Sequence, residues 1–161
     1  MDPKKRRATG RQPTFDIESA LSYRISSLYA RLSGGTTQEL AGFDLALREW
    51  RVMAILARHE PMAAAELVAR SPLDKASVSR AVASLEAKGL LSVAPSSGDA
   101  RRKELRLTAD GWALYAEVAP LAIARQKALV SALTTSERAA LVSMLDRVER
   151  QIDLYYRRAS E

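Results

Sequence analysis

Apolar residues recur at helical spacing near both ends of the chain. One stripe consists of Ile17, Leu21, Ile25, Leu28 and Leu32, and the other of Leu141, Leu145, Val148, Ile152 and Tyr155. Steps of three and four residues place each stripe on one face of a helix. We expect the first helix to begin at Asp16, whose carboxylate can accept from free N–H groups, and to end at Gly34 and Gly35. The last helix is expected to begin near Thr135, with Glu137 in its first turn.

The middle of the chain combines shorter helical patterns with one alternating stretch. Helices are expected over about residues 44–59, 63–70 and 75–88, the third of them capped by Asp74 and Gly89. Residues 90–94 and the alternation at 105–107 predict a β-hairpin, because the residues between them include a run typical of turns, 95–99. Thr108 is expected to open another long helix, in which Pro120 can introduce a kink. The predicted fold is mostly α, with six helices and one hairpin.

Composition limits the class of protein. The chain has 161 residues, of which 47% are apolar, which is enough for a packed core. No apolar run approaches the ~20 residues of a membrane span, and residues 1–13 form a polar, basic stretch that we expect to be a disordered tail. We therefore expect a cytoplasmic protein with no membrane partner. The absence of cysteine excludes disulfides, thiol nucleophiles and cysteine-ligated zinc.

Positive charge is concentrated in two parts of the chain. The formal net charge is +6. Residues 1–15 hold five basic side chains against one acidic, and residues 61–108 hold eight against five. Such a distribution is typical of a protein that contacts a polyanion with part of its surface. The tail alone is less informative, because a basic tail can keep a protein soluble or add nonspecific phosphate contacts.

Several short segments follow one another in a recognisable order. The most specific are Asp-x-Arg-x-Lys at residues 99–103 and Leu-Thr-x-x-Gly at 107–111. The others lie at residues 47–56, 65–67, 74–80 and 85–91. In these segments the chain resembles the MarR family of winged helix-turn-helix transcriptional regulators, in detail over about residues 45–111 and in outline over about 16–157.

The resemblance implies an intertwined homodimer. Residues 14–35 and 109–161 would be the dimerisation helices, although their apolar faces can also complete the core of a single chain. Residues 44–108 would be the winged helix-turn-helix lobe. A two-fold dimer presents two recognition helices about 34 Å apart, which suits a pseudo-palindromic DNA site.

Two groups of residues are candidates for DNA contact. The helix that begins after Asp74 can lead into the major groove with its N-terminal residues, although Val78 can equally belong to the core and Ser77 and Ser79 to an ordinary exposed surface. The hairpin can place an arginine in the minor groove, and the family resemblance assigns this role to Arg101. Because a carboxylate does not suit direct contact with phosphate, we expect Asp99 to form an ion pair that orients an arginine, Arg80 or Arg101. The predicted DNA-binding residues are Lys75, Ser77, Val78, Ser79, Arg80, Arg101, Arg102 and Lys103.

The resemblance also implies an effector pocket between the dimerisation helices and the DNA-binding lobe. Arginines beside aromatic rings suit an anionic aromatic ligand, so we expect an aromatic acid or its thioester. The alternative is that the tryptophans belong to the core and the arginines form surface ion pairs. The candidate effector-binding residues are Tyr23, Arg24, Ser27, Arg31, Arg48, Trp50, Arg51, His59, Trp112 and Tyr115.

Catalysis and metal binding have little support in the sequence. There is one histidine, no nucleophile elbow and no phosphate-binding loop, so we expect neither an enzyme nor a metal site nor a cofactor. Two alternatives to a ligand-released repressor remain open at this point. The chain can be a winged-helix module without a sensor, used for sequence-tolerant DNA binding or for protein interaction, or it can be an activator.

Overall fold

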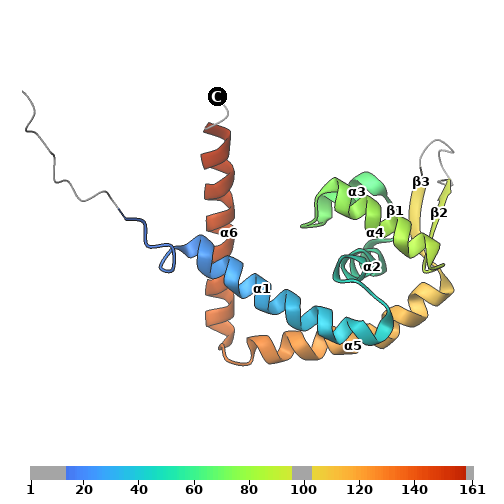
Figure 1. Ribbon diagram of the computed structural model, residues 1–161, viewed down its shortest axis with the longest axis horizontal. Coiled ribbons are helices and arrows are strands. Elements are labelled where there is room, and N and C mark those ends of the chain that lie inside the picture. Colours follow the sequence, from blue (N-terminus) through green and yellow to red (C-terminus); the bar gives the residue numbers. More distant parts are fainter. Residues whose placement is uncertain (1–13, 96–102, 159–161) are drawn as a thin grey trace, which may run out of the picture. The chain divides into compact units, whose positions relative to one another are not determined.

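The computed structural model describes residues 14–95 and 103–158 (Figure 1). The chain divides into two compact units, residues 1–47 and 48–161. The first contains α1 (Leu21–Leu40) and a short 3-10 helix, η1 (Ala41–Phe43). The second contains α2 (Leu47–His59), β1 (Met62–Ala63), α3 (Ala64–Arg70), α4 (Lys75–Ala87), β2 (Leu91–Pro95), β3 (Lys103–Leu107), α5 (Ala109–Val130) and α6 (Thr135–Arg158). The boundary between the units falls after Leu47, the first residue of α2. Six α-helices with a small antiparallel sheet confirm the predicted fold class.

The limits of α1 differ from the prediction at both ends. Asp16 accepts hydrogen bonds from the backbone of Glu18 and Ser19 in a turn, and the helix begins later, at Leu21. It also continues through the two glycines that were expected to end it. Glycine costs a helix about 1 kcal/mol relative to alanine, which burial of one large side chain can offset. Beyond the glycine pair Leu40 is buried, so the additional turns hold a core residue.

The second helix was also placed too early. It begins at Leu47 and not near Asp44. Asp44 has a φ of 49°, in the left-handed region, and follows the short helix η1. A residue in this conformation ends helical geometry, and aspartate tolerates it better than most side chains do.

The sheet has three strands, in the order β1-β3-β2. The hairpin pairs β2 with β3 in antiparallel register from Leu91 opposite Leu107 to Pro95 opposite Lys103. On the other side of β3, Met62 of β1 lies opposite Leu105. The sequence does not predict β1, because two residues are too few to show an alternating pattern.

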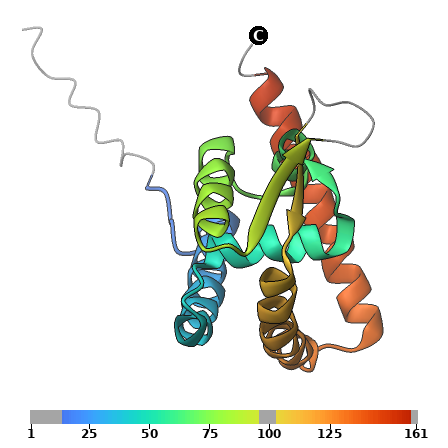
Figure 2. The same ribbon diagram turned by 90° about the vertical axis from the view of Figure 1, so that its right-hand side faces the viewer.

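The core of the second unit lies between the helix-turn-helix and the sheet. In both views α3 and α4 lie beside the strands (Figures 1 and 2). The buried apolar side chains come from each of these elements and from α2. They include Val52, Met53, Leu56, Leu67, Ala81, Leu85, Leu91 and Leu105. Helix α4 is thus anchored through one apolar face, which leaves its other face exposed.

Thr108 and Gly111 explain the Leu-Thr-x-x-Gly motif. Thr108 is the N-cap of α5, where its hydroxyl accepts from the Gly111 N–H at 3.0 Å and donates to the Gly89 carbonyl at 2.7 Å. A Cβ on Gly111 would lie 2.1 Å from the backbone oxygen of Leu90. Gly89 itself has a φ of +71°, as a glycine at a helix C-terminus allows. The motif therefore ties the start of α5 to the end of α4.

Helix α6 begins with a capping box. The Thr134 backbone N–H donates to the Glu137 carboxylate at 2.7 Å, and the Glu137 N–H donates to the Thr134 hydroxyl at 3.3 Å. The bonds from Thr134 lower the pKa of Glu137 below its ordinary value. None of the residues of α6 is buried in the single chain. Among the helices of residues 14–95 and 103–158, none has the length and apolar character needed to cross a membrane.

Candidate nucleic-acid interface and effector site

The start of α4 is organised by Asp74. Its carboxylate accepts from the Ser77 backbone N–H at 2.8 Å and from the Ser77 hydroxyl at 2.7 Å. The hydroxyl and backbone bonds from Ser77, with a smaller contribution from the charge of Arg80, hold the pKa of Asp74 below its ordinary value. Asp74 was predicted as the N-cap, and this prediction is confirmed.

The side chain of Arg80 is held against the same turn. Its Nη2 donates to the Ser77 hydroxyl at 3.0 Å, so Ser77 links the capping carboxylate to the guanidinium. Arg80 and Ser79 are exposed, as is Lys75, whereas Ser77 is half-buried. These exposed groups lie on the first two turns of α4, where a recognition helix contacts base edges and phosphates.

Val78 must be removed from the predicted DNA-binding residues. Its exposed fraction is 2%, and it belongs to the core. The spacing explains this, since Val78, Ala81 and Leu85 fall at steps of three and four and form the buried face of α4. The alternative assignment of Val78 to the core is therefore the correct one.

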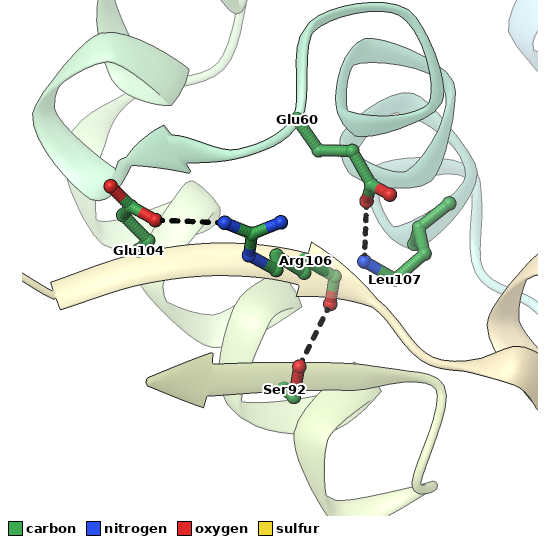
Figure 3. A network of polar contacts seen from close by, with 5 residues as sticks. All are labelled: Glu60, Ser92, Glu104, Arg106 and Leu107. Atoms are coloured by element: carbon green, nitrogen blue, oxygen red, sulfur yellow. Dashed lines mark hydrogen bonds and ion pairs between the residues drawn. The ribbon is translucent and has the colours of Figure 1, made fainter. Parts of the chain in front are cut away.

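Of the DNA contacts predicted for the hairpin, Lys103 lies within the residues that the structure describes. Lys103 is exposed at the start of β3. Arg106, further along β3, forms an ion pair with Glu104 at 3.2 Å, and its carbonyl accepts from the Ser92 hydroxyl at 3.5 Å (Figure 3). Asp99, Arg101 and Arg102 lie outside the residues that the structure describes.

A buried carboxylate that the sequence analysis did not single out connects α2 to α4. Glu49 is 2% exposed and accepts from the Ser84 hydroxyl and from the Lys88 ammonium, the latter at 3.2 Å. Both partners lie on the C-terminal part of α4 or at its C-cap. A buried charge is tolerated only when it is paired and hydrogen-bonded, so this contact holds α4 against α2. In the sequence, Glu49 falls within the apolar stripe of α2. A charged residue at such a position indicates a buried carboxylate with a specific partner, and this was the signal that could have identified it.

Three of the predicted effector residues form one aromatic cluster. Trp50 of α2 and Tyr115 of α5 stack with ring centroids 5.6 Å apart, and Trp112 meets Tyr115 edge-on at the same separation. Trp50 is 8% exposed and Trp112 is 39% exposed. The cluster therefore extends from the core to the surface, where Trp112 presents an exposed aromatic face.

The other predicted effector residues are divided between the two units. Arg48 and His59 are exposed on α2, and Arg51 is half-buried. Four further residues lie on the exposed surface of α1, in the first unit: Tyr23, Arg24, Ser27 and Arg31. That these side chains form one pocket with the aromatic cluster stays a prediction. Within the described part of the chain, no cluster of three or more histidine, aspartate or glutamate residues could hold a metal ion.

Glu60 is a second functional candidate that the sequence analysis missed. One carboxylate oxygen accepts from the Leu107 backbone N–H at 2.6 Å, as Figure 3 shows, and the other accepts from the Trp112 indole N–H at 3.0 Å. A glutamate before a proline, beyond the end of a helix, carries no sequence signal of such a role. The connection depends on contacts across about fifty residues of chain.

Comparison with known proteins identifies the family to which this chain is similar. Residues 43–102 match the family model of the MarR family. The HTH-type transcriptional repressor NicR of Pseudomonas putida is 25% identical over 131 residues, which cover 81% of this chain and 83% of that protein. The structure of a MarR/EmrR family transcriptional regulator from Acinetobacter sp. ADP1 has a TM-score of 0.80 at 27% identity and covers 87% of this chain and 99% of the other.

A further structure shares the fold at lower identity. It is that of Bordetella bronchiseptica BpsR, from work on the regulation of DNA binding by 6-hydroxynicotinic acid. It has a TM-score of 0.75 at 23% identity and covers 85% of this chain and 98% of BpsR. Together with the family match, these likenesses confirm the resemblance on which the sequence analysis relied.

Proposed function

We propose that this chain is a transcriptional regulator of the MarR family, a repressor that binds DNA as a homodimer and is released by a small aromatic acid or its thioester. The observation that carries the proposal is the arrangement of α4. Its apolar face is buried and its opposite face presents Lys75, Ser79 and Arg80 to solvent. A helix anchored in this way can enter the major groove without losing core contacts.

The contact with DNA follows from the chemistry of these exposed groups. A guanidinium can donate two hydrogen bonds to guanine, and serine can bond to base edges or phosphates. Arg80 is oriented by Ser77, which reduces the side-chain entropy that binding has to remove. Lys103 on β3 adds positive charge to the hairpin, and we assign Arg101 and Arg102 to the same hairpin contact. The expected operator is a pseudo-palindrome with half-sites about one helical turn apart.

Dimerisation is supported by the apolar surface of the first and last helices. Large apolar side chains of α1 and α6 are 40–65% exposed, and a stable monomer would leave this surface in water. A C2 dimer formed through these helices would cover it and would fix the spacing of the two copies of α4. Folding stability would then depend on protein concentration.

The proposed effector is supported by the aromatic cluster and by relatives. Trp112 and Tyr115 offer rings for stacking, and α2, whose Trp50 stacks on Tyr115, also carries Arg48 and Arg51, which can pair with a carboxylate. BpsR, which shares the fold, has its DNA binding regulated by 6-hydroxynicotinic acid, an aromatic carboxylic acid. A ligand that favours a dimer with the wrong helix spacing lowers DNA affinity by linkage, and a coupling of about 1–3 kcal/mol would give roughly 5–150-fold release.

The proposal is tested by selecting bound duplexes from a random pool and footprinting the protein on them. We expect enrichment of a two-fold symmetric site and protection of two half-sites on one DNA face. Calorimetry with benzoate and 6-hydroxynicotinic acid then tests the effector. Equal affinity for all duplexes at fixed salt would contradict the repressor, and no heat from either acid at millimolar concentration would remove this effector class.

A further inference from the structure

Glu60 joins two elements that have different tasks in the proposed function. Its Oε2 accepts from the N–H of Leu107, the last residue of β3, at 2.6 Å. Its Oε1 accepts from the indole N–H of Trp112, near the start of α5, at 3.0 Å. Bonds to an ionised carboxylate are among the stronger hydrogen bonds of proteins. One side chain thus ties the base of the hairpin to α5.

The connection continues from Trp112 into the core. Trp112 meets Tyr115 edge-on, and Tyr115 stacks on Trp50 with an angle of 18° between the ring planes. Trp50 is buried on α2, whereas Trp112 is 39% exposed. A ligand or substitution that moves the exposed indole therefore acts directly on a donor of Glu60.

Leu107 is well placed to pass such a change to the sheet. It is 6% exposed and lies opposite Leu91 at the open end of the β2–β3 hairpin, away from the connection between the two strands. Two residues earlier, Leu105 lies opposite both Val93 of β2 and Met62 of β1. Since β3 is the central strand, displacement of its end alters the pairing on both sides.

We infer that Glu60 is a positioning residue that couples Trp112 to the hairpin strands, so that a change at the aromatic cluster reaches the DNA-contacting hairpin through its carboxylate. This inference rests on the proposed function for its biological meaning, but the coupling is a property of the chain alone. Trp112→Phe keeps an aromatic ring at this position and removes the indole N–H that donates to Glu60. Glu60→Gln keeps the size and places an amide N–H against one of two donors.

The test is amide hydrogen exchange of the full-length, 15N-labelled protein without DNA or acid. We expect Trp112→Phe and Glu60→Gln each to lower the protection of the β3 amides, including Leu105, by about tenfold, and the double variant to lower it no further. Glu104→Gln is the matched control, because this carboxylate lies on β3 itself and pairs with Arg106 of the same strand. It should leave the Leu105 amide unchanged.

The two tryptophans provide a spectroscopic check that a general loss of stability would not mimic. The indole N–H resonance that disappears in Trp112→Phe should move upfield in Glu60→Gln, while the Trp50 resonance stays near its position. Unchanged protection of Leu105 in folded Trp112→Phe, or additive effects in the double variant, would overturn the inference. If Glu60→Gln fails to fold, the exchange result of Trp112→Phe alone tests the coupling, because this variant retains the Glu60 carboxylate.

A second measurement separates this inference from the proposed function. The affinity of wild type and Trp112→Phe is measured for the selected duplex. Wild type that binds no duplex selectively would remove the proposed function and leave the exchange result standing. Selective binding that Trp112→Phe retains in full, despite lost protection of β3, would leave the coupling to the hairpin strands standing and would overturn only its effect on DNA contact.

Discussion

The Glu49 carboxylate on α2 lies 3.2 Å from the Lys88 ammonium at the C-cap of α4. Glu49 is 2% exposed, and the Lys88 side chain is 29% exposed. The pair therefore has one member in the core and one at its edge. It sets the position of α4 at the end opposite to the Asp74 cap, which leaves the N-terminal turns free to contact a partner.

Removal of Lys88 is expected to destabilise the fold. Lys88→Met takes away the cation that compensates a buried carboxylate, and we expect the free energy of unfolding to fall by about 2 kcal/mol. Glu49→Met combined with Lys88→Met should recover part of this loss, because it removes the buried charge as well. Urea unfolding at one protein concentration measures both. A loss no larger than that of the exposed control Lys127→Met would show that the pair contributes nothing.

Two glycines are expected to respond to alanine in opposite ways. Gly111→Ala would bring its Cβ to 2.1 Å from the Leu90 carbonyl oxygen, so the joint between α4 and α5 has to shift. We expect a loss of about 2–4 kcal/mol. Gly34 lies inside α1, where a methyl group would meet nothing within 4 Å, and Gly34→Ala should stabilise by about 0.5–1 kcal/mol. Thermal unfolding of both variants tests this prediction, and equal shifts of the unfolding temperature would contradict the structure.

Asp74 should contribute to the acid sensitivity of the protein. Its pKa in the fold is lowered, chiefly by the bonds from Ser77, so its stabilisation is present above the ordinary value of 3.8 and is lost as the pH falls through the lowered pKa. Asp74→Asn keeps a capping side chain but cannot titrate. We expect the variant to lose less stability than wild type as the pH falls from about 4 to about 2, in urea titrations at each pH. Parallel profiles would show that Asp74 titrates alike in the folded and unfolded states.

The proposed dimer is tested on α6. Leu145 lies in the stripe of Leu141, Val148 and Ile152, and it is 43% exposed in the single chain. Leu145→Glu introduces a charge into that stripe, and we expect dissociation to monomers in sedimentation experiments. Ser143→Glu adds the same charge on the other side of the helix and should leave the dimer intact. Equal behaviour of the two variants would assign the dimer to another surface.

Local chemistry made much of the fold predictable. Asp74, Thr108 and Gly89 were assigned to the helix ends where the structure has them, because capping depends on neighbouring backbone groups. The glycine pair in α1 predicts a helix end that the structure does not have, because the end of this helix depends on whether later turns can bury Leu40. The two-residue strand β1 exists only through its pairing with β3, and no local pattern could reveal it.

In the candidate site, too, the residues set by local sequence were predictable and those set by long-range contacts were not. The exposed residues of α4 follow from the helix-turn-helix pattern and its family resemblance. Glu49 and Glu60 act through partners that lie 35 to 52 residues away in the chain, so only the folded structure brings them to notice. Long-range contacts of single polar side chains leave no periodic trace in the sequence.

Whether this chain is a sequence-selective DNA-binding regulator is tested by a binding titration. The duplex is the intergenic DNA beside its own gene, and the proteins are wild type, Arg80→Ala, Arg101→Ala and the control Arg58→Ala, an exposed arginine on α2. We expect tight, site-selective binding that falls about tenfold or more in the first two variants and is unchanged in the control. Weak binding that is indifferent to sequence and to both arginines would contradict the claim and would direct attention to protein partners.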